Sequence, residues 1–217
     1  MKKIRQKKER FTVSASARAI RNCSRCKMLA LEIARRALGD ELDAKTIVPL
    51  HFVMSRNTDQ LHASHRAAAD ALRPSLDAGL DVAMLNLGDV SIYATFGYLQ
   101  EILAAEGYPT AMAAGVPSFC AAAARLNRPL TGGMDLPLTI APGSCASEAL
   151  KAPGSKVLMK IGRQMPELLE ELSQQQKLAQ SALVCNCGLP DEQVCPDLRT
   201  YRPDTSAGYF ATVLVKE

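Results

Sequence analysis

The sequence contains no tryptophan, and aromatic residues make up only 5% of its 217 residues. Because proteins that bind single-stranded nucleic acid usually stack bases on aromatic side chains, this shortage argues against that class of function. No run of about 18 apolar residues occurs, so the sequence predicts no membrane-spanning helix. Contents of 47% hydrophobic and 22% charged residues are instead typical of a soluble globular protein.

Several common catalytic and nucleotide-binding motifs are also missing. The chain has neither a G-x-x-x-x-G-K-[ST] phosphate loop nor a G-x-G-x-x-G dinucleotide fingerprint. Its three histidines, His51, His62 and His65, are not part of an H-E-x-x-H motif. We therefore expect surface histidines and no metal site, and no set of serine, cysteine and histidine residues predicts a nucleophile.

Positive charge is concentrated at the start of the chain. Residues 1–36 carry a net charge of +10, whereas the remainder carries −6. A basic start can bind nucleic acid or a membrane surface, but solvated disorder is the simpler interpretation. We expect residues 1–27 to be irregular and partly disordered, with no nucleic-acid or membrane partner. No apolar segment follows "MKKIRQKKER", so the segment is not typical of a secretory signal.

The seven cysteines are an odd number and are scattered along the chain. Cys23 and Cys26 have the spacing of half a zinc site, but Cys185 and Cys187 do not supply a matching second pair. We interpret all seven as reduced thiols of a cytoplasmic protein.

From residue 46 onward, strand-like and helix-like segments alternate, which predicts an α/β fold with a parallel N-terminal sheet. The last two strands follow each other without a helix, so the C-terminal sheet should be mixed. We expect two α/β domains, 1–114 and 115–217. Residues 14–42 are mostly helix-like and contain no clear first strand. The predicted strands are 46–54, 81–88, 109–115, 137–143, 155–162, 181–188 and 207–217, and the predicted helices are 57–79, 91–107, 116–127, 144–152 and 166–180.

The segment "LGDVSIYATF", residues 87–96, predicts an abrupt strand-to-helix turn. Gly88 would let a ligand approach the backbone, Asp89 would orient a polar group of it, and Ser91 would cap the following helix. Such turns face the edge of an open α/β sheet where ligands bind. An ordinary tight turn explains the same residues equally simply.

Two further segments also allow two interpretations. In "AAGVPSFCAAAARLNRPL", Gly115 would end a strand, and Pro117 and Ser118 would open a helix that packs against a ligand or simply in the core. In "SKVLMKIGRQ", Met159 is more often a core residue than a ligand contact, and Lys160 is more often solvated than functional.

In their order and spacing, these segments resemble the tetrapyrrole methylase family, S-adenosylmethionine-dependent enzymes of corrin and sirohaem synthesis. Within that family, the resemblance is strongest to the branch that methylates carbon 20 of precorrin-2 or cobalt-factor II. The matching segments are "PLHFVMSRN", "GLDVAMLNLGDVSIYATFGYL", "AGVPSFCAAAARLNRPL", "LTIAPG", "VLMKIGR" and "GYFATVLV".

The resemblance implies two α/β domains with S-adenosylmethionine in the cleft between them, and a homodimer. It implies that the protein is a C-methyltransferase acting on a tetrapyrrole, and it names no catalytic side chain. Tetrapyrrole carboxylates would need cations, for which Arg56, Lys160 and Arg163 are the chosen candidates, with Arg125 and Arg128 as further ones. The implied donor contacts are Leu87, Gly88, Asp89, Ile92, Tyr93, Pro117, Ser118, Met159 and Gly188.

The chain departs from the family pattern at its N-terminal end. The family opens with a strand and a Gly-x-Gly-Pro-Gly-Asp-Pro loop, and no such loop is present here. We expect the central strand of the N-terminal sheet to be missing unless residues 2–13 replace it. Val90 also stands where the family has proline, and "AGVPS" where it has Pro-Gly-Val-Ser-Ser. The alternatives are a working methyltransferase with an unusual start and a non-catalytic remnant that binds tetrapyrrole or S-adenosylmethionine.

Overall fold

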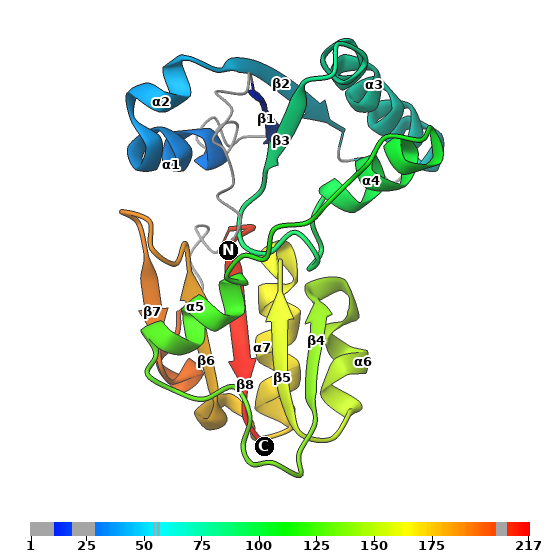
Figure 1. Cartoon of the computed structure of the whole chain (residues 1–217). Coiled ribbons are helices and arrows are strands. Elements are labelled where there is room, and N and C mark those ends of the chain that lie inside the picture. The colour runs from blue at the N-terminus through cyan, green and yellow to red at the C-terminus, as the bar shows by residue number, and fades with distance from the viewer. Residues whose placement is uncertain (1–10, 19–28, 54, 56, 203–207) are drawn as a thin grey trace. The chain divides into compact units, whose positions relative to one another are not determined.

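The chain divides into two compact units, Met1–Gly115 and Val116–Glu217, which are described separately. The computed structural model describes residues 11–18, 29–53, 55, 57–202 and 208–217 (Figure 1). None of the helices in this part of the chain is long and apolar enough to cross a membrane.

Unit 1 is built on a three-stranded parallel sheet. Its strands are β1 (Phe11–Arg18), β2 (Thr46–Phe52) and β3 (Asp81–Leu85), in the order β2-β1-β3. The central strand was expected to be missing unless residues 2–13 replaced it, and residues 1–27 were expected to be irregular. Instead, residues 11–18 form β1, which pairs with both neighbours, so the expected irregularity is wrong for these residues. The segment consists mainly of small residues, so its strand character depends on the backbone partners that the fold places on either side.

Helices cover both faces of this sheet (Figure 1). On one face, α3 (Thr58–Asp77) and α4 (Phe96–Ala105) pack against alternate residues of β2, including Leu50 and Phe52. On the other face, α1 (Leu29–Leu38) and α2 (Asp40–Asp43) bury Leu31 and Leu42 against partly buried residues that include Ile47 and Leu85. The alternation of Ile47 with Leu50 and Phe52 follows from the two-residue period of a strand.

Helix α3 begins where the sequence predicts. The Asn57 side chain caps it by accepting hydrogen bonds from the N–H groups of Asp59 and Gln60, at 2.9 and 3.2 Å. One expectation for this helix is wrong. His65 is buried, and its ring stacks on Tyr98 at a centroid distance of 4.3 Å, whereas His51 and His62 are exposed.

Two other predicted elements of unit 1 differ from the structure. Residues 109–115, predicted as a strand, form no ladder and are exposed. This segment is rich in alanine and offers little apolar surface to bury. The helix predicted from Ser91 begins only at Phe96, after an irregular segment, 86–95.

The sheet of unit 2 is mixed, as predicted, and it has five strands in the order β4-β5-β8-β6-β7. Strands β4, β5 and β6 run parallel to one another, and β7 and β8 are antiparallel to their neighbours. β7 was not predicted, because it has only three residues and lies between turn-forming residues. The strands are β4 (Leu138–Pro142), β5 (Ser155–Met159), β6 (Ser181–Cys185), β7 (Gln193–Cys195) and β8 (Ala211–Val215).

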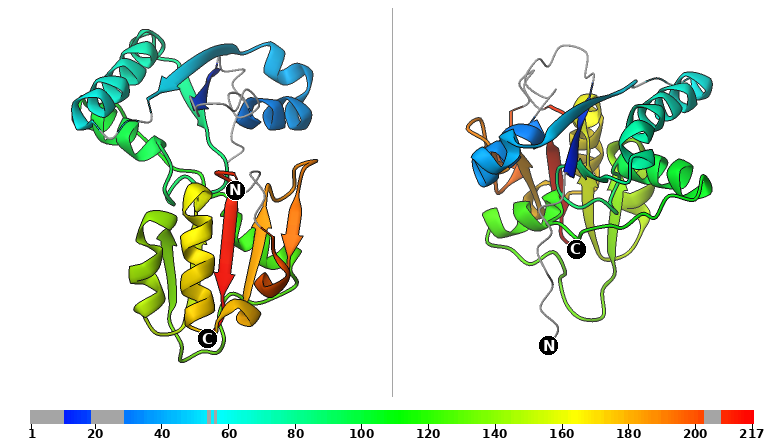
Figure 2. Two further views of the ribbon diagram at one scale, coloured as in Figure 1. Left: turned by 180° about the vertical axis from the view of Figure 1, so that it is seen from behind. Right: turned by 45° about the horizontal axis from the view of Figure 1, so that its top comes forward.

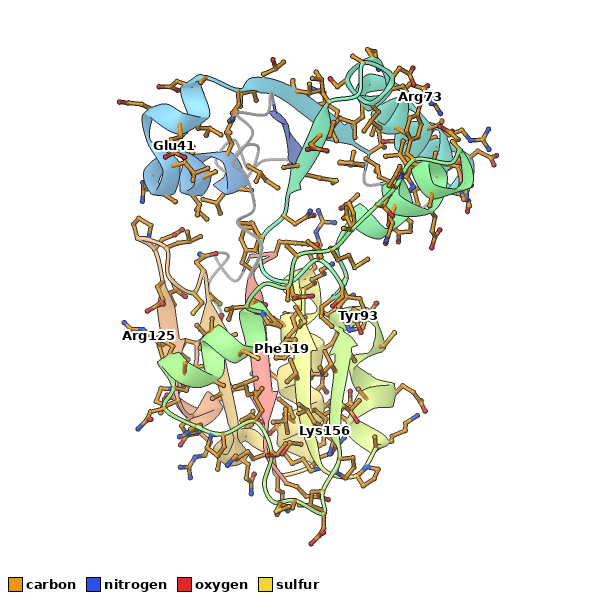
Figure 3. The ribbon with its side chains drawn as sticks, in the orientation of Figure 1. Glu41, Arg73, Tyr93, Phe119, Arg125 and Lys156 are labelled. Atoms are coloured by element: carbon orange, nitrogen blue, oxygen red, sulfur yellow. The ribbon has the colours of Figure 1, made fainter. Side chains whose placement is uncertain are left out.

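Helices also cover both faces of this second sheet (Figures 1 and 2). α6 (Ala146–Lys151) and α7 (Met165–Gln174) enclose the largest core cluster, to which β5, β6 and β8 contribute. α5 (Ser118–Arg125) lies on the opposite face and buries Phe119 (Figure 3). Short 3-10 turns link the elements at η2 (Gly143–Cys145), η3 (Gly162–Gln164), η4 (Leu178–Gln180) and η5 (Leu198–Thr200).

Candidate functional site

In unit 1, the chain leaves β3 through a glycine turn that another glycine approaches closely. Gly88 has a φ of 76°, a left-handed conformation that glycine adopts without a steric penalty. A Cβ on Gly115 would lie only 2.2 Å from the carbonyl oxygen of Gly88. The glycine at position 115 is therefore required by close contact between two backbone segments, and not by its own dihedral angles.

The carboxylate of Asp89 holds these two segments together. It accepts hydrogen bonds from the N–H groups of Gly115 and Ser91, each at 2.8 Å, and from the Ser91 hydroxyl. The Ser91 hydroxyl, the Gly115 N–H and the Ser91 N–H lower the pKa of the Asp89 carboxyl, because all three stabilise its charged form. The prediction that Ser91 caps the next helix is wrong, since Thr95 occupies the N-cap position.

The remaining unit 1 candidates follow in the same loop. Leu87 and Tyr93 are large side chains that are each 42% exposed, and Ile92 is half-buried. Tyr93, labelled in Figure 3, is a bulky residue. Its φ is 48°, which is uncommon for a non-glycine residue and especially for a bulky one. Residues held in such conformations cluster at functional sites. The loop therefore combines exposed apolar side chains with a backbone fixed by Asp89.

In unit 2, the candidate residues gather at one edge of the sheet. The carboxyl ends of β4, β5 and β6 meet there, since the three strands are parallel. Both β5 and β6 are followed at once by a left-handed non-glycine residue, Lys160 with a φ of 56° and Asn186 with a φ of 51°. Gly188, with a φ of 78°, comes two residues later. In open α/β sheets this edge is where ligands bind.

The side chains at this edge differ in their exposure to solvent. Met159 ends β5 and is only 8% exposed. Lys160 is half-buried, and its Nζ lies 5.7 Å from the centre of the Tyr209 ring. Arg163, in η3, is exposed. At the start of α5, Pro117 is the N-cap residue and Ser118 is exposed.

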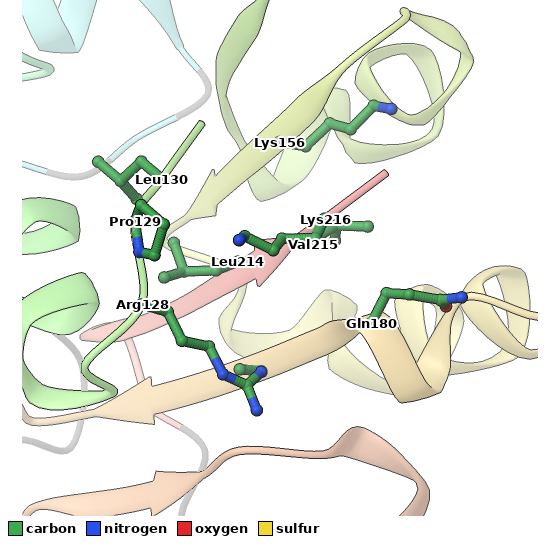
Figure 4. Close-up of a pocket in the computed structure, with 9 residues that line it drawn as sticks. Arg128, Pro129, Leu130, Lys156, Gln180, Leu214, Val215 and Lys216 are labelled. Carbon is green, nitrogen blue, oxygen red and sulfur yellow. The ribbon is translucent and has the colours of Figure 1, made fainter. Parts of the chain in front are cut away.

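Two other cations that were predicted to bind tetrapyrrole carboxylates, Arg56 and Arg128, do not lie at this edge among the described residues. Arg56 lies outside the described residues. Arg128 lines a pocket on the α5 side of unit 2 together with residues that include Gln180 and Lys216 (Figure 4). Arg128 is therefore part of a different surface from the strand-end edge that carries Lys160.

Sequence reasoning missed two features of the unit 2 edge. A Cβ on Gly143 would lie 2.7 Å from the Cα of Ile161, so the ends of β4 and β5 touch through this glycine. The "PG" dipeptide at the end of the predicted strand 137–143 is the available sequence signal. The Glu192 carboxylate binds the N–H of Gly188 at 2.7 Å and also Nε of Arg125. No sequence pattern connects these three residues.

Each unit can contribute to binding S-adenosylmethionine. The ligand is a nucleoside with an amino-acid tail, which needs apolar contact for the base and backbone groups for its polar atoms. In unit 1, Leu87 and Tyr93 expose apolar surface, and in unit 2 nothing lies within 4 Å of a Cβ built on Gly188. The residues present therefore fit the donor. No group of three or more metal-ligating side chains occurs in the part of the chain that the structure describes.

Comparison with known proteins identifies the class to which this fold and these loops belong. Residues 11–200 match the family model of the Tetrapyrrole (Corrin/Porphyrin) Methylases. The chain belongs to this family. It is accordingly a methyltransferase that uses S-adenosylmethionine, as the resemblance of its motifs predicted.

Several individual proteins that are similar to this chain are C(20)-methyltransferases. The chain is 29% identical to the cobalt-precorrin-2 C(20)-methyltransferase of Salmonella typhimurium, over 87% of this chain and 79% of that protein. It is 26% identical to the precorrin-2 C(20)-methyltransferase of a Sinorhizobium species, over 77% and 72%. A probable cobalt-precorrin-2 C(20)-methyltransferase of Methanocaldococcus jannaschii is 34% identical, over 51% of this chain and 46% of the other.

Solved structures support the fold. A cobalt precorrin-4 methyltransferase has a TM-score of 0.61 at 14% identity and matches 94% of this chain and 83% of its own. A uroporphyrin-III C-methyltransferase of Thermus thermophilus, complexed with S-adenosyl homocysteine, has a TM-score of 0.56 at 16% identity, with coverages of 96% and 97%. Both likenesses confirm the tetrapyrrole methylase fold.

Proposed function

We propose that this protein transfers the methyl group of S-adenosylmethionine to carbon 20 of precorrin-2, or of its cobalt-containing form, in cobalamin biosynthesis. The observation that carries this proposal is the match to a C(20)-methyltransferase over 87% of the chain. Relatives with and without cobalt in their names match at similar identity, so both substrates belong to the proposal. Any cobalt would arrive as part of the substrate.

Methyl transfer from S-adenosylmethionine to this carbon requires little chemical participation by individual side chains. A sulfonium methyl group is already activated, and carbon 20 of a reduced tetrapyrrole is an enamine-like nucleophile. The protein mainly has to align the methyl group with that carbon and exclude water. The rigid backbone around Asp89 and around Gly188 supports this role, because both loops are fixed by carboxylate hydrogen bonds.

Donor contacts are proposed separately for the two units. In unit 1 they are Leu87, Gly88, Asp89, Ile92 and Tyr93, with Asp89 acting mainly through the backbone groups that it holds. In unit 2 they are Pro117, Ser118, Met159 and Gly188.

The carboxylates of the tetrapyrrole are proposed to bind Arg56, Lys160 and Arg163. The exposure of Arg163 and the fixed left-handed backbone of Lys160 support these two assignments. Arg125 is a weaker candidate, since Glu192 already binds it.

The first test is calorimetric titration with S-adenosylmethionine and with S-adenosylhomocysteine. We expect micromolar binding, about −8 kcal/mol. Methyl transfer to precorrin-2 and to its cobalt form should then be assayed in parallel. Absence of donor binding by folded protein contradicts the proposal. Binding without transfer to either substrate supports the alternative, a non-catalytic protein that binds the same ligands.

We also propose that the protein acts as a homodimer in the cytoplasm, without nucleic-acid or membrane partners. Light scattering after size-exclusion chromatography tests the dimer. Salt-sensitive binding to DNA or RNA contradicts the proposed absence of a nucleic-acid partner.

A further inference from the structure

Glu192 lies in the loop between β6 and β7, and it connects two elements of unit 2 that are far apart in the sequence. One carboxylate oxygen accepts a hydrogen bond of 2.7 Å from the N–H of Gly188. The other accepts from Nε of Arg125, 67 residues earlier, at the last residue of α5. The thiol of Cys187 is hydrogen-bonded to the same carboxylate.

This carboxylate is well enclosed compared with its partner. The Glu192 side chain is 14% exposed, whereas the Arg125 side chain is 59% exposed. Figure 3 labels Arg125 on α5. The Gly188 N–H and the Arg125 guanidinium hold the pKa of the Glu192 carboxyl below its usual range, so the group is charged at neutral pH. A charged acceptor makes stronger hydrogen bonds than a neutral one.

The loop that Glu192 holds contains two residues with left-handed backbone conformations. Asn186 and Gly188 are both left-handed, with φ of 51° and 78°. Backbone hydrogen bonds from Leu189 N to Asn186 O and from Glu192 N to Leu189 O, at 2.9 and 3.0 Å, fold it into consecutive turns. Without the Glu192 carboxylate, the Gly188 N–H would lose the side-chain acceptor that ties it to the other end of this loop.

We propose that Glu192 is a positioning residue for the methyl donor. Its carboxylate fixes Gly188 in the conformation that S-adenosylmethionine contacts, and Arg125 holds that carboxylate in place from the end of α5. The N–H of Gly188 is thereby used inside the protein, so a bound donor is recognised by other groups of this loop. This inference rests on the proposed function, because it assigns Gly188 to the donor site.

The test replaces the carboxylate with an amide of the same size. Glu192→Gln removes the charge and points an N–H₂ group toward either Arg125 or Gly188, so one of the two hydrogen bonds is lost. We expect the dissociation constants of S-adenosylmethionine and S-adenosylhomocysteine to rise about tenfold. The matched control is Glu148→Gln, which makes the same chemical change at an exposed carboxylate paired with Lys151 at 3.0 Å. It should bind as the wild type does.

Two measurements separate positioning from general stability. In the methyl-transfer assay, Glu192→Gln should raise the KM for the donor, while kcat at saturating donor and the KM for the tetrapyrrole stay near wild type. Arg125→Met leaves the Glu192 carboxylate next to Gly188, so it should weaken donor binding less than Glu192→Gln does. In the double variant, the loss of free energy of donor binding should be smaller than the sum of the losses in the two single variants. Arg125→Met also provides the test if Glu192→Gln does not fold.

The possible outcomes are distinguishable. If the wild type binds neither ligand, the proposed function fails, and the inference fails with it. If the wild type binds the donor and Glu192→Gln binds it equally well, only the inference is overturned. Equal rises in both KM values with a large fall in Tm would also overturn it, since they indicate a purely structural role.

Discussion

The backbone N–H of Gly115 donates a 2.8 Å hydrogen bond to the carboxylate of Asp89, 26 residues earlier in the chain. The same glycine lies so close to Gly88 that any side chain would collide with the Gly88 carbonyl oxygen. The loop after β3 and the last residue of unit 1 thus form one rigid element. Asp89 and Gly115 both lie in segments that resemble the tetrapyrrole methylase family. Mutation of either residue therefore tests whether this rigid element supports donor binding.

Gly115→Ala places a methyl group 2.2 Å from the Gly88 carbonyl oxygen, so the backbone has to move. We expect a loss of about 1–3 kcal/mol in the free energy of unfolding, together with weaker binding of S-adenosylmethionine. Urea denaturation and calorimetry measure the two effects. Gly97→Ala is the control, since nothing lies within 4 Å of its Cβ. Because Gly97 lies in α4, this change should stabilise by about 0.5–1 kcal/mol. Equal stabilities of the two variants would contradict the close approach.

Asp89→Asn removes the charge that three hydrogen bonds stabilise. We expect donor affinity to fall about tenfold. The pKa of this carboxyl is lowered by the Ser91 hydroxyl first and by the two backbone N–H groups. Its stabilising contribution is therefore complete above its ordinary value of about 4 and is lost as the pH falls through the lower folded value.

Thermal unfolding between pH 2 and pH 7 checks this acid dependence. The difference in Tm between wild type and Asp89→Asn should shrink toward the acidic end. Asp135→Asn, at an exposed position, provides the control and should follow the wild type throughout. A constant difference at all pH values would show that the charge of Asp89 is not responsible.

His65→Phe tests the buried imidazole between Phe52 and Tyr98, whose ring centroids lie 6.1 and 4.3 Å from it. Burial, with a smaller contribution from His62, lowers the pKa of His65. The unfolded chain therefore binds a proton more readily below about pH 6.5, so wild-type stability falls with pH from there down to the folded pKa. Phenylalanine keeps the ring and removes the titration, so the variant should show a flatter Tm profile over this range. His62→Gln, at an exposed position, should retain most of the pH dependence; a profile as flat as that of His65→Phe would contradict the assignment.

Lys156→Met tests a buried ammonium group in β5. Lys156 is 2% exposed, and its Nζ donates to the carbonyl oxygen of Gly154 at 2.5 Å. Burial lowers its pKa. Between the folded pKa and about 10.4, only the unfolded chain holds this proton, so wild-type stability should rise with pH in that window.

Replacement of a buried charge by an apolar side chain of similar size is often neutral or stabilising. We expect Lys156→Met to have a Tm at or above wild type at pH 7 and to lack the alkaline rise, measured by calorimetric scans from pH 7 to pH 10. Lys151→Met, at an exposed lysine, should keep it.

The family and most of the helices and strands are predictable from the sequence alone. Short apolar segments that alternate with helix-like segments predicted strands β2, β3, β4, β5, β6 and β8, because the strands of a sheet covered on both faces are nearly continuous apolar runs. The cap at Asn57 was predictable, because its hydrogen bonds reach only two and three residues along the chain. Local rules of this kind act within one turn or one strand, and a single sequence contains all that they need.

Features that depend on partners far apart in the sequence follow from the folded structure and are not predictable from local patterns. β1 becomes a central strand because β2 and β3 supply hydrogen bonds on both sides, although its own residues predict no strand. Residues 109–115 remain irregular because no strand pairs with them among the described residues. The contacts of Asp89 with Gly115 and of Glu192 with Arg125 join positions 26 and 67 residues apart. No periodicity encodes such contacts, since they form only when the fold brings the two segments together.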